Sequence, residues 1–162
     1  MKAGGRAGIV IKNTFLSNAD NASVNLRKLL LETCNLHTIL ELPSGTFHGA
    51  GVKTVVLFFQ KGAPTHNVWV YQLDPARNLG KTNALNDEDV ADFLMRQKTF
   101  AQGTRSWTVI LATKGLKNFD LTLVNPNERV EPGLKHPAAL LDEIEMLDAS
   151  SKQILKNLRD LL

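Results

Sequence analysis

One stretch of the chain, residues 42–54, combines the residue types best suited to holding a ligand. It reads Leu-Pro-Ser-Gly-Thr-Phe-His-Gly-Ala-Gly-Val-Lys-Thr, so an aromatic side chain (Phe47) and a histidine stand on a small-residue backbone. Apolar runs at residues 38–42 and 54–60 flank it and predict buried strands. Loops of this length inside a compact domain are usually functional or disordered. We therefore predict a loop that contacts a ligand.

A second polar segment follows the apolar run at residues 7–11. In open α/β sheets, ligands collect outside the carboxyl ends of the strands. Lys12, Asn13 and Thr14 are therefore candidates for contact with the same ligand. The alternative is a polar strand-to-helix loop whose Asn, Ser and Thr residues cap a helix.

Several other chemistries are excluded by motif. The glycines at 45, 49 and 51 have the wrong spacing and setting for a P-loop or a dinucleotide fingerprint. The four histidines show no metal-ligand spacing, no motif pairs carboxylates for acid–base catalysis, and Gly-x-Ser-x-Gly is absent. Cys34, the single cysteine, fits a buried thiol better than a nucleophile.

Composition fits a globular protein of one core. The 162 residues carry a net charge of +3, which permits a nucleic-acid partner without demanding one. With one cysteine, no internal disulfide and no signal peptide, we expect a cytoplasmic location. No apolar run approaches the roughly 18 residues that a membrane span needs.

The elements that must position these residues alternate between strand and helix. A strand at 7–11, a helix at 22–33 and a strand at 38–42 form a parallel unit. The strand at 54–60 returns without room for a crossover helix, so it must pair antiparallel. Further strands at 68–73 and 106–111 and a helix capped by Asn86 complete an α/β fold. The inward faces of the two helices are expected to be Leu26, Leu29, Leu30 and Thr33 in the first, and Val90, Phe93, Leu94 and Gln97 in the second.

The last segment has a regular heptad spacing. Its seam steps alternately by four and three residues, with one polar member. The charges are acidic in the first half and basic in the second, which complements a helix dipole. We expect this helix to bind a partner helix; the alternative is packing against its own domain. The seam residues are Leu140, Ile144, Leu147, Ser151, Ile154, Leu158 and Leu161.

These runs together resemble the N6-adenine DNA methylase family, and most closely the modification subunit of type I restriction-modification systems. Order, spacing and loop content agree over residues 3–73, and more weakly to residue 125. The quoted runs are Gly-Gly-Arg-Ala-Gly-Ile-Val-Ile at 4–11, Leu-Arg-Lys-Leu-Leu-Leu-Glu at 26–32, the loop at 42–54, and the strand with its Lys-Gly at 55–62.

The resemblance implies a fold and a division into domains. Residues 1–73 would be the C-terminal half of a Rossmann-like methyltransferase domain, with the antiparallel last strand typical of that fold. Residues 74–135 would form an α+β extension, and residues 136–162 a partner-binding helix. The chain begins directly at an apolar strand, so we expect that part of the domain is missing, and the exposed apolar surface would favour self-association.

The resemblance also implies a function. The family transfers a methyl group from S-adenosylmethionine to adenine N6 in double-stranded DNA, which requires a flipped-out base. Phe47 would then contact the target base, unless it packs in the core. Gly49 and Gly51 would allow close backbone approach, and Lys53 and Thr54 would touch the base edge or a phosphate. Where the family often has proline after its first strand here, this chain has lysine at position 12.

The family's cofactor and catalytic motifs are absent. The only Asn-Pro pair, at 125–126, is followed by asparagine rather than by proline and an aromatic residue. No catalytic residue is therefore assigned, and we expect this chain alone to bind no S-adenosylmethionine and to be inactive. Expected partners are DNA, the specificity and restriction subunits, and the N-terminal part of the methyltransferase subunit. The alternatives are a non-catalytic assembly module acting through the C-terminal helix, or an unrelated α/β binding domain.

Overall fold

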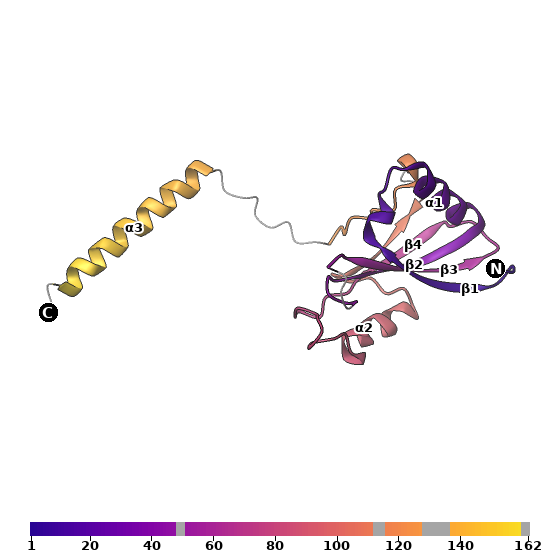
Figure 1. Ribbon diagram of the computed structural model, residues 1–162, viewed down its shortest axis with the longest axis horizontal. Coiled ribbons are helices and arrows are strands. Elements are labelled where there is room, and N and C mark those ends of the chain that lie inside the picture. Colours follow the sequence, from indigo (N-terminus) through magenta and orange to yellow (C-terminus); the bar gives the residue numbers. More distant parts are fainter. Residues whose placement is uncertain (48–50, 112–115, 128–136, 160–162) are drawn as a thin grey trace. The chain divides into compact units, whose positions relative to one another are not determined.

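The computed structural model describes residues 1–47, 51–111, 116–127 and 137–159. Contacts divide the chain into two units, Met1–Glu128 and Arg129–Leu162. In the first unit a five-stranded sheet lies between helix α1 on one face and helix α2 on the other (Figure 1). Its strands are β1 (Arg6–Lys12), β2 (Cys34–Leu42), β3 (Thr54–Lys61), β4 (Asn67–Gln72) and β5 (Ser106–Ile110). Its helices are α1 (Asn21–Thr33) and α2 (Asp87–Gln97), with short 3-10 turns η1 (Asn13–Leu16) and η3 (Lys117–Phe119).

The strand order is β1-β3-β2-β4-β5. Strand β3 pairs antiparallel with both β1 and β2, so the sequence prediction of an antiparallel third strand is confirmed. Strand β4 pairs parallel with β2, and β5 pairs antiparallel with β4. The carboxyl ends of β1, β2 and β4 therefore meet the amino ends of β3 and β5 at one end of the sheet.

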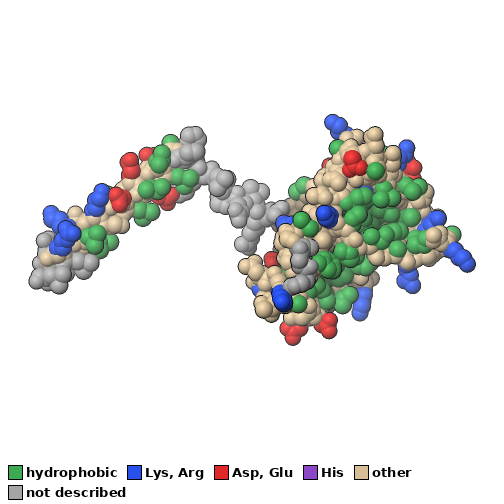
Figure 2. Space-filling model, viewed as in Figure 1, with side chains coloured by type: hydrophobic (Ala, Val, Ile, Leu, Met, Phe, Trp, Pro, Cys, Tyr) green, Lys and Arg blue, Asp and Glu red, His purple; other side chains and the backbone are tan. Residues whose placement is uncertain are grey.

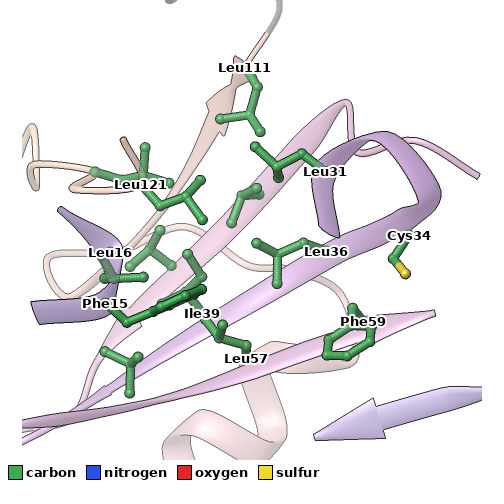
Figure 3. Packing of buried hydrophobic residues seen from close by; sticks show 14 of the residues in the cluster. Phe15, Leu16, Leu31, Cys34, Leu36, Ile39, Leu57, Phe59, Leu111 and Leu121 are labelled. Carbon is green, nitrogen blue, oxygen red and sulfur yellow. The ribbon is translucent and has the colours of Figure 1, made fainter. Parts of the chain in front are cut away.

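Alternation along the strands divides the core between the two faces. On β2, Ile39 points toward α1 and Leu40 toward α2; on β4, Val70 and Tyr71 do the same. The α1-side cluster is the larger and also takes residues from η1 and from the segment after η3 (Figure 3). A sheet covered on both faces explains why its central strands are almost continuously apolar.

The buried face of α1 differs from the expected one. Leu26 and Leu29 are 52% and 56% exposed, whereas Arg27 is fully buried and Leu31 nearly so. Arg27 was not part of the predicted inward face, and a charged side chain normally faces water. Here its guanidinium donates to four backbone carbonyls, those of Phe15, Asn18, Asn118 and Phe119, at 2.6–3.0 Å. Satisfied donors make the burial of this charge possible.

Helix α2 begins as expected. The Asn86 side chain accepts from the backbone of Asp89, and the Asp89 carboxylate accepts in return from the backbone of Asn86. Phe93 is buried against the sheet, but Leu94 is 52% exposed, so that part of the predicted inward stripe is wrong. The face of α2 that packs on the sheet is therefore narrower than the stripe of apolar residues in its sequence.

The described part of the second unit is one helix, α3 (Pro137–Arg159). Its seam side chains are exposed: 42% for Leu140, 61% for Ile144, 64% for Leu147 and 58% for Ile154. The Leu158 side chain and all of Leu161 lie outside the described part. Among the described residues, no helix is long and apolar enough to cross a membrane.

Candidate functional site

A cleft of about 410 Å³ opens at the end of the sheet where the carboxyl ends of β1, β2 and β4 meet. Its lining comes from the last residues of these strands and from the residues that lead into β3 and β5. This is the position where ligands bind in open α/β sheets. The lining residues are Asn13, Glu41, Leu42, Pro43, Lys53, Thr54, Gln72, Leu73, Asp74 and Arg105.

Three residues singled out from the sequence meet in this cleft: Asn13, Lys53 and Thr54. The backbone N–H of Asn13 donates to the carbonyl of Lys53 at 3.0 Å, which joins the segment after β1 to the start of β3. The next residue pair in the ladder is Lys12 and Thr54, whose Cα atoms are partners in the register. Lys12 itself is exposed and is not among the residues that line the cleft.

Arg27 holds the segment that carries Asn13. Its guanidinium donates to the carbonyls of Phe15 and Asn18, both within five residues of Asn13. The guanidinium carbon also lies 5.7 Å from the centroid of the Phe15 ring. Asn13 therefore projects from a short turn that is fastened to the core rather than from a free loop.

Thr54 contributes an unsatisfied hydroxyl. The residue is 8% exposed, and its Oγ1 is buried without a hydrogen-bond partner in the described part of the chain. A buried polar group without a partner costs about 1–3 kcal/mol. A ligand that bonds to this hydroxyl would recover that cost, so Thr54 favours occupation of the cleft by a polar group.

The loop after β2 starts at the cleft and carries Phe47. The Thr46 hydroxyl donates to the Pro43 carbonyl at 2.7 Å, and Gly45 adopts φ +82° against the Leu79 carbonyl. Phe47 is 41% exposed and belongs to neither buried cluster, so it does not fill the core as the alternative supposed.

Gly49 and Gly51, the two glycines proposed from the sequence for close backbone approach, belong to the later part of this loop. Among the described residues, no heavy atom lies within 4 Å of a Cβ built at Gly51. Gly49 lies outside the described residues. The contacts of this loop with a ligand remain a prediction.

Four polar residues of the cleft were missed by sequence reasoning: Glu41, Gln72, Asp74 and Arg105. They converge because β4 is parallel to β2, which brings Gln72 beside Glu41 in the register. The Leu73 N–H donates to the Glu41 carbonyl at 2.9 Å and extends this pairing by one residue. Had the strand at 68–73 been recognised as parallel, its carboxyl end would have been included among the candidates.

A second polar cleft of about 210 Å³ shares Arg105 with the first. In it the Tyr71 hydroxyl donates to Asp92 at 2.7 Å, and Arg96 Nε donates to the same carboxylate at 2.8 Å. Burial, then the hydrogen bond to Asp92, raises the pKa of Tyr71 to about 12. The Tyr71 hydrogen bond is the main cause that lowers the pKa of Asp92. Tyr71 is thus a neutral donor rather than a base.

Helix α3 carries the second candidate surface. Hydrophobic side chains are visible along its length (Figure 2). Beside the seam, Leu141 and Leu155 are 62% and 57% exposed. Apolar seam residues with an added flanking position are typical of helices that enter a bundle. The Ser151 hydroxyl donates to the Leu147 carbonyl at 2.9 Å, so the polar seam member is satisfied within the helix.

Comparisons with known sequences and solved structures point to one family. The family model described as N-6 DNA Methylase matches residues 1–131. The type I restriction enzyme EcoEI methylase subunit of Escherichia coli is 32% identical over 98% of this chain and 34% of its own length. A solved modification subunit of a putative type I restriction enzyme from Vibrio vulnificus YJ016 is 29% identical, with a TM-score of 0.68 over 77% of this chain and 28% of that one.

A further solved structure concerns complex assembly and conformational transition of the type I R-M system. It is 28% identical and has a TM-score of 0.68, and the match covers 99% of this chain and 36% of that one. The chain thus spans about a third of the length of these relatives.

Proposed function

The chain belongs to the N-6 DNA methylase family, and we propose that it acts as the C-terminal part of a type I restriction-modification methyltransferase subunit. In that role it contributes one wall of the site where adenine in double-stranded DNA is methylated at N6. Its sheet would continue a Rossmann-like methyltransferase sheet beyond β1. Strand β1 stands at the edge of the sheet formed by the described residues, and its Ile9 and Val10 are 47% and 51% exposed, which supports this continuation.

The cleft at the carboxyl end of the sheet is the observation that carries the proposal. It brings Asn13, Lys53 and Thr54 together, and it leaves the buried Thr54 hydroxyl without a partner in the described chain. Methylating an exocyclic amine requires the base to leave the duplex and enter a pocket with polar edge contacts and aromatic stacking. A donor amide, a cation and a hydroxyl suit the edge of such a base.

Phe47 supplies the stacking face in this proposal. Its ring is partly exposed on a loop whose first residues line the cleft. Stacking of a base on an aromatic side chain is worth about 1–3 kcal/mol and requires no sequence readout. Gly49 and Gly51 would let the backbone approach the flipped nucleotide, while Lys53, with Lys12 nearby on β1, would neutralise a phosphate.

The family uses S-adenosylmethionine, which would supply the methyl group in the complete enzyme. Residues of this chain do not fit the family's cofactor and catalytic motifs. The only Asn-Pro pair begins with Asn125, which is 6% exposed and whose amide nitrogen is engaged by the Thr104 carbonyl at 2.9 Å and by Gln72 at 3.0 Å. We expect no heat of binding when this chain is titrated with S-adenosylmethionine in a calorimeter; tight binding would contradict the assignment.

Phe47→Ala tests the base contact. The probe is a duplex with an adenine opposite an abasic site, whose extrusion costs little. We expect about tenfold weaker binding by fluorescence anisotropy, in line with loss of one stacking contact. Phe100→Ala is the matched control, since Phe100 is similarly exposed (43%) but contacts His37 and Trp69. Equal binding by wild type and Phe47→Ala would exclude the stacking role.

A second role, assembly, is favoured by α3. Its exposed seam suits docking against helices of the specificity subunit, and through them association with the restriction subunit. This role stands alone if the chain is a non-catalytic assembly module. We expect deletion of residues 138–162 to abolish capture of a specificity subunit in a pull-down while the first unit keeps its urea unfolding transition. Unchanged capture would refute the docking role.

A further inference from the structure

A chain of three amides behind the cleft has a fixed direction. It starts at the backbone N–H of Asn127, which donates to Asn125 Oδ1 at 2.8 Å. A backbone N–H can only donate, so this contact identifies the Asn125 oxygen. The Asn125 nitrogen must then face the other way, where it donates to the Thr104 carbonyl at 2.9 Å and to Gln72 Oε1 at 3.0 Å.

The direction of this relay fixes the orientation of Gln72. Since Asn125 donates to it, Gln72 presents its oxygen to Asn125 and keeps its amide nitrogen on the other side. That nitrogen has no partner among the described residues, and Gln72 lines the cleft. Asn125 is 6% exposed, so water competes little with the relay. Gln72 is therefore a neutral donor of set orientation.

We propose that Gln72 recognises the target base, by donating from Nε2 to one ring nitrogen of adenine. This inference rests on the proposed function of the cleft and names a contact within it. The acceptors that adenine offers are its ring nitrogens, and Gln is a side chain that pairs with adenine edges through its amide.

The charged residues of the cleft are less suited to donate to a ring nitrogen of adenine. Glu41 and Asp74 are acceptors when ionised and would meet a ring nitrogen with like polarity. Arg105 donates to the Asp74 carbonyl and lies 3.9 Å from the Asp74 carboxylate, half exposed. Lys53 is a flexible cation that attracts phosphate as readily as a base. Unlike these four side chains, the Gln72 donor is uncharged, and it is oriented by a buried partner.

The test measures binding of the 162-residue chain to duplexes with adenine, 1-deazaadenine, 3-deazaadenine or 7-deazaadenine opposite an abasic site. Each analogue replaces one acceptor nitrogen with C–H. We expect wild type to lose about three- to tenfold in affinity for one of the three analogues, the value of one hydrogen bond. Gln72→Glu, which keeps an oxygen for Asn125 but has no donor, should bind adenine and that analogue equally.

Gln72→Met repeats the test without an added charge, so electrostatic repulsion of DNA cannot account for the result. Gln60→Glu is the matched control, because Gln60 is an exposed glutamine near the opposite end of β3. It should keep the full discrimination of wild type. Asn125→Asp should also abolish discrimination, because Gln72 would turn its nitrogen toward the new carboxylate.

The outcomes separate this inference from the function on which it rests. If wild type binds abasic-opposed adenine no better than a fully paired duplex, the proposed function fails. If it binds preferentially but discriminates none of the analogues, or if both Gln72 variants keep the discrimination, only the role of Gln72 is overturned.

Discussion

Each unit departs from the usual pattern in which charged residues are exposed and apolar residues are buried. In the first unit a charged residue, Arg27, is completely buried on α1. In the second, Leu147 and Ile144 on α3 are more than 60% exposed. The difference is the supply of partners: four backbone carbonyls surround the guanidinium, whereas within the described part of the second unit, a single helix, no apolar surface covers the seam.

This contrast separates residues that hold the cleft in place from exposed residues that we propose for partner binding. Arg27 ties η1 to η3 and thereby fixes the turn from which Asn13 enters the cleft. The leucines of α3 are exposed where their side chains are described. Stability and assembly should therefore respond to different substitutions.

Replacing Arg27 should have the largest effect. Arg27→Met leaves four carbonyls in the interior without their donors, and we expect a loss of about 3–5 kcal/mol in the free energy of unfolding, measured in urea. Lys28→Met is the control, since Lys28 is exposed and makes a 3.9 Å surface pair with Glu32 and a 5.9 Å contact with the Phe119 ring, and it should change stability by less than about 0.5 kcal/mol. A loss below about 1 kcal/mol for Arg27→Met would show that buried Arg27 stabilises the first unit little more than an exposed residue does.

Gly45→Ala should come next. A Cβ at this position would collide with the Leu79 carbonyl, and φ +82° is strained for any L side chain. We expect a loss of about 2–3 kcal/mol, or a displaced Phe47 loop, detected by urea unfolding and by hydrogen exchange of residues 43–47. Gly51→Ala has open space and should be nearly neutral. Equal effects at both positions would mean that the first part of this loop is not held by the unit.

The Tyr71 hydroxyl, paired with Asp92, should ionise at a higher pH than an ordinary tyrosine. Tyr71 is the chain's single tyrosine, so absorbance at 295 nm reports it alone, and we expect ionisation near pH 12. The unfolded tyrosine ionises near 10, so the stability it contributes is complete below about pH 10 and is lost as pH rises through about 12. Asp92→Asn should remove only part of the rise in the Tyr71 pKa, because burial of Tyr71 is the largest cause of that rise. Ionisation near pH 10 in the folded protein would show that this buried polar pair does not form.

Substitutions on α3 should have the smallest effect on stability. Leu147→Ala removes a 64% exposed side chain, and we expect a change below about 0.5 kcal/mol in the unfolding of the first unit. The comparison is Leu121→Ala, which removes a fully buried side chain and should cost about 2–5 kcal/mol. A large effect of Leu147→Ala would show that α3 is covered by its own chain rather than reserved for a partner.

Local signals determined much of the fold from sequence alone. The strands at 7–11, 38–42 and 54–60 and the helix at 22–33 follow from apolar runs and their spacing, and Asn86 marks the start of α2 through its capping box. The antiparallel direction of β3 followed from the shortness of its connection. Each of these signals is contained within a few residues, which is why no tertiary information was needed.

Only the tertiary structure decided which groups face each other. The burial of Arg27 depends on carbonyls up to 92 positions away in the chain, so the α1 face was predicted wrongly. The cleft gained Gln72 and Arg105 because β4 lies parallel to β2, and the orientation of Gln72 depends on Asn125, 53 positions later. Periodicity reports how apolar a face is, but the satisfaction of a polar group depends on partners that the fold brings together from distant parts of the chain.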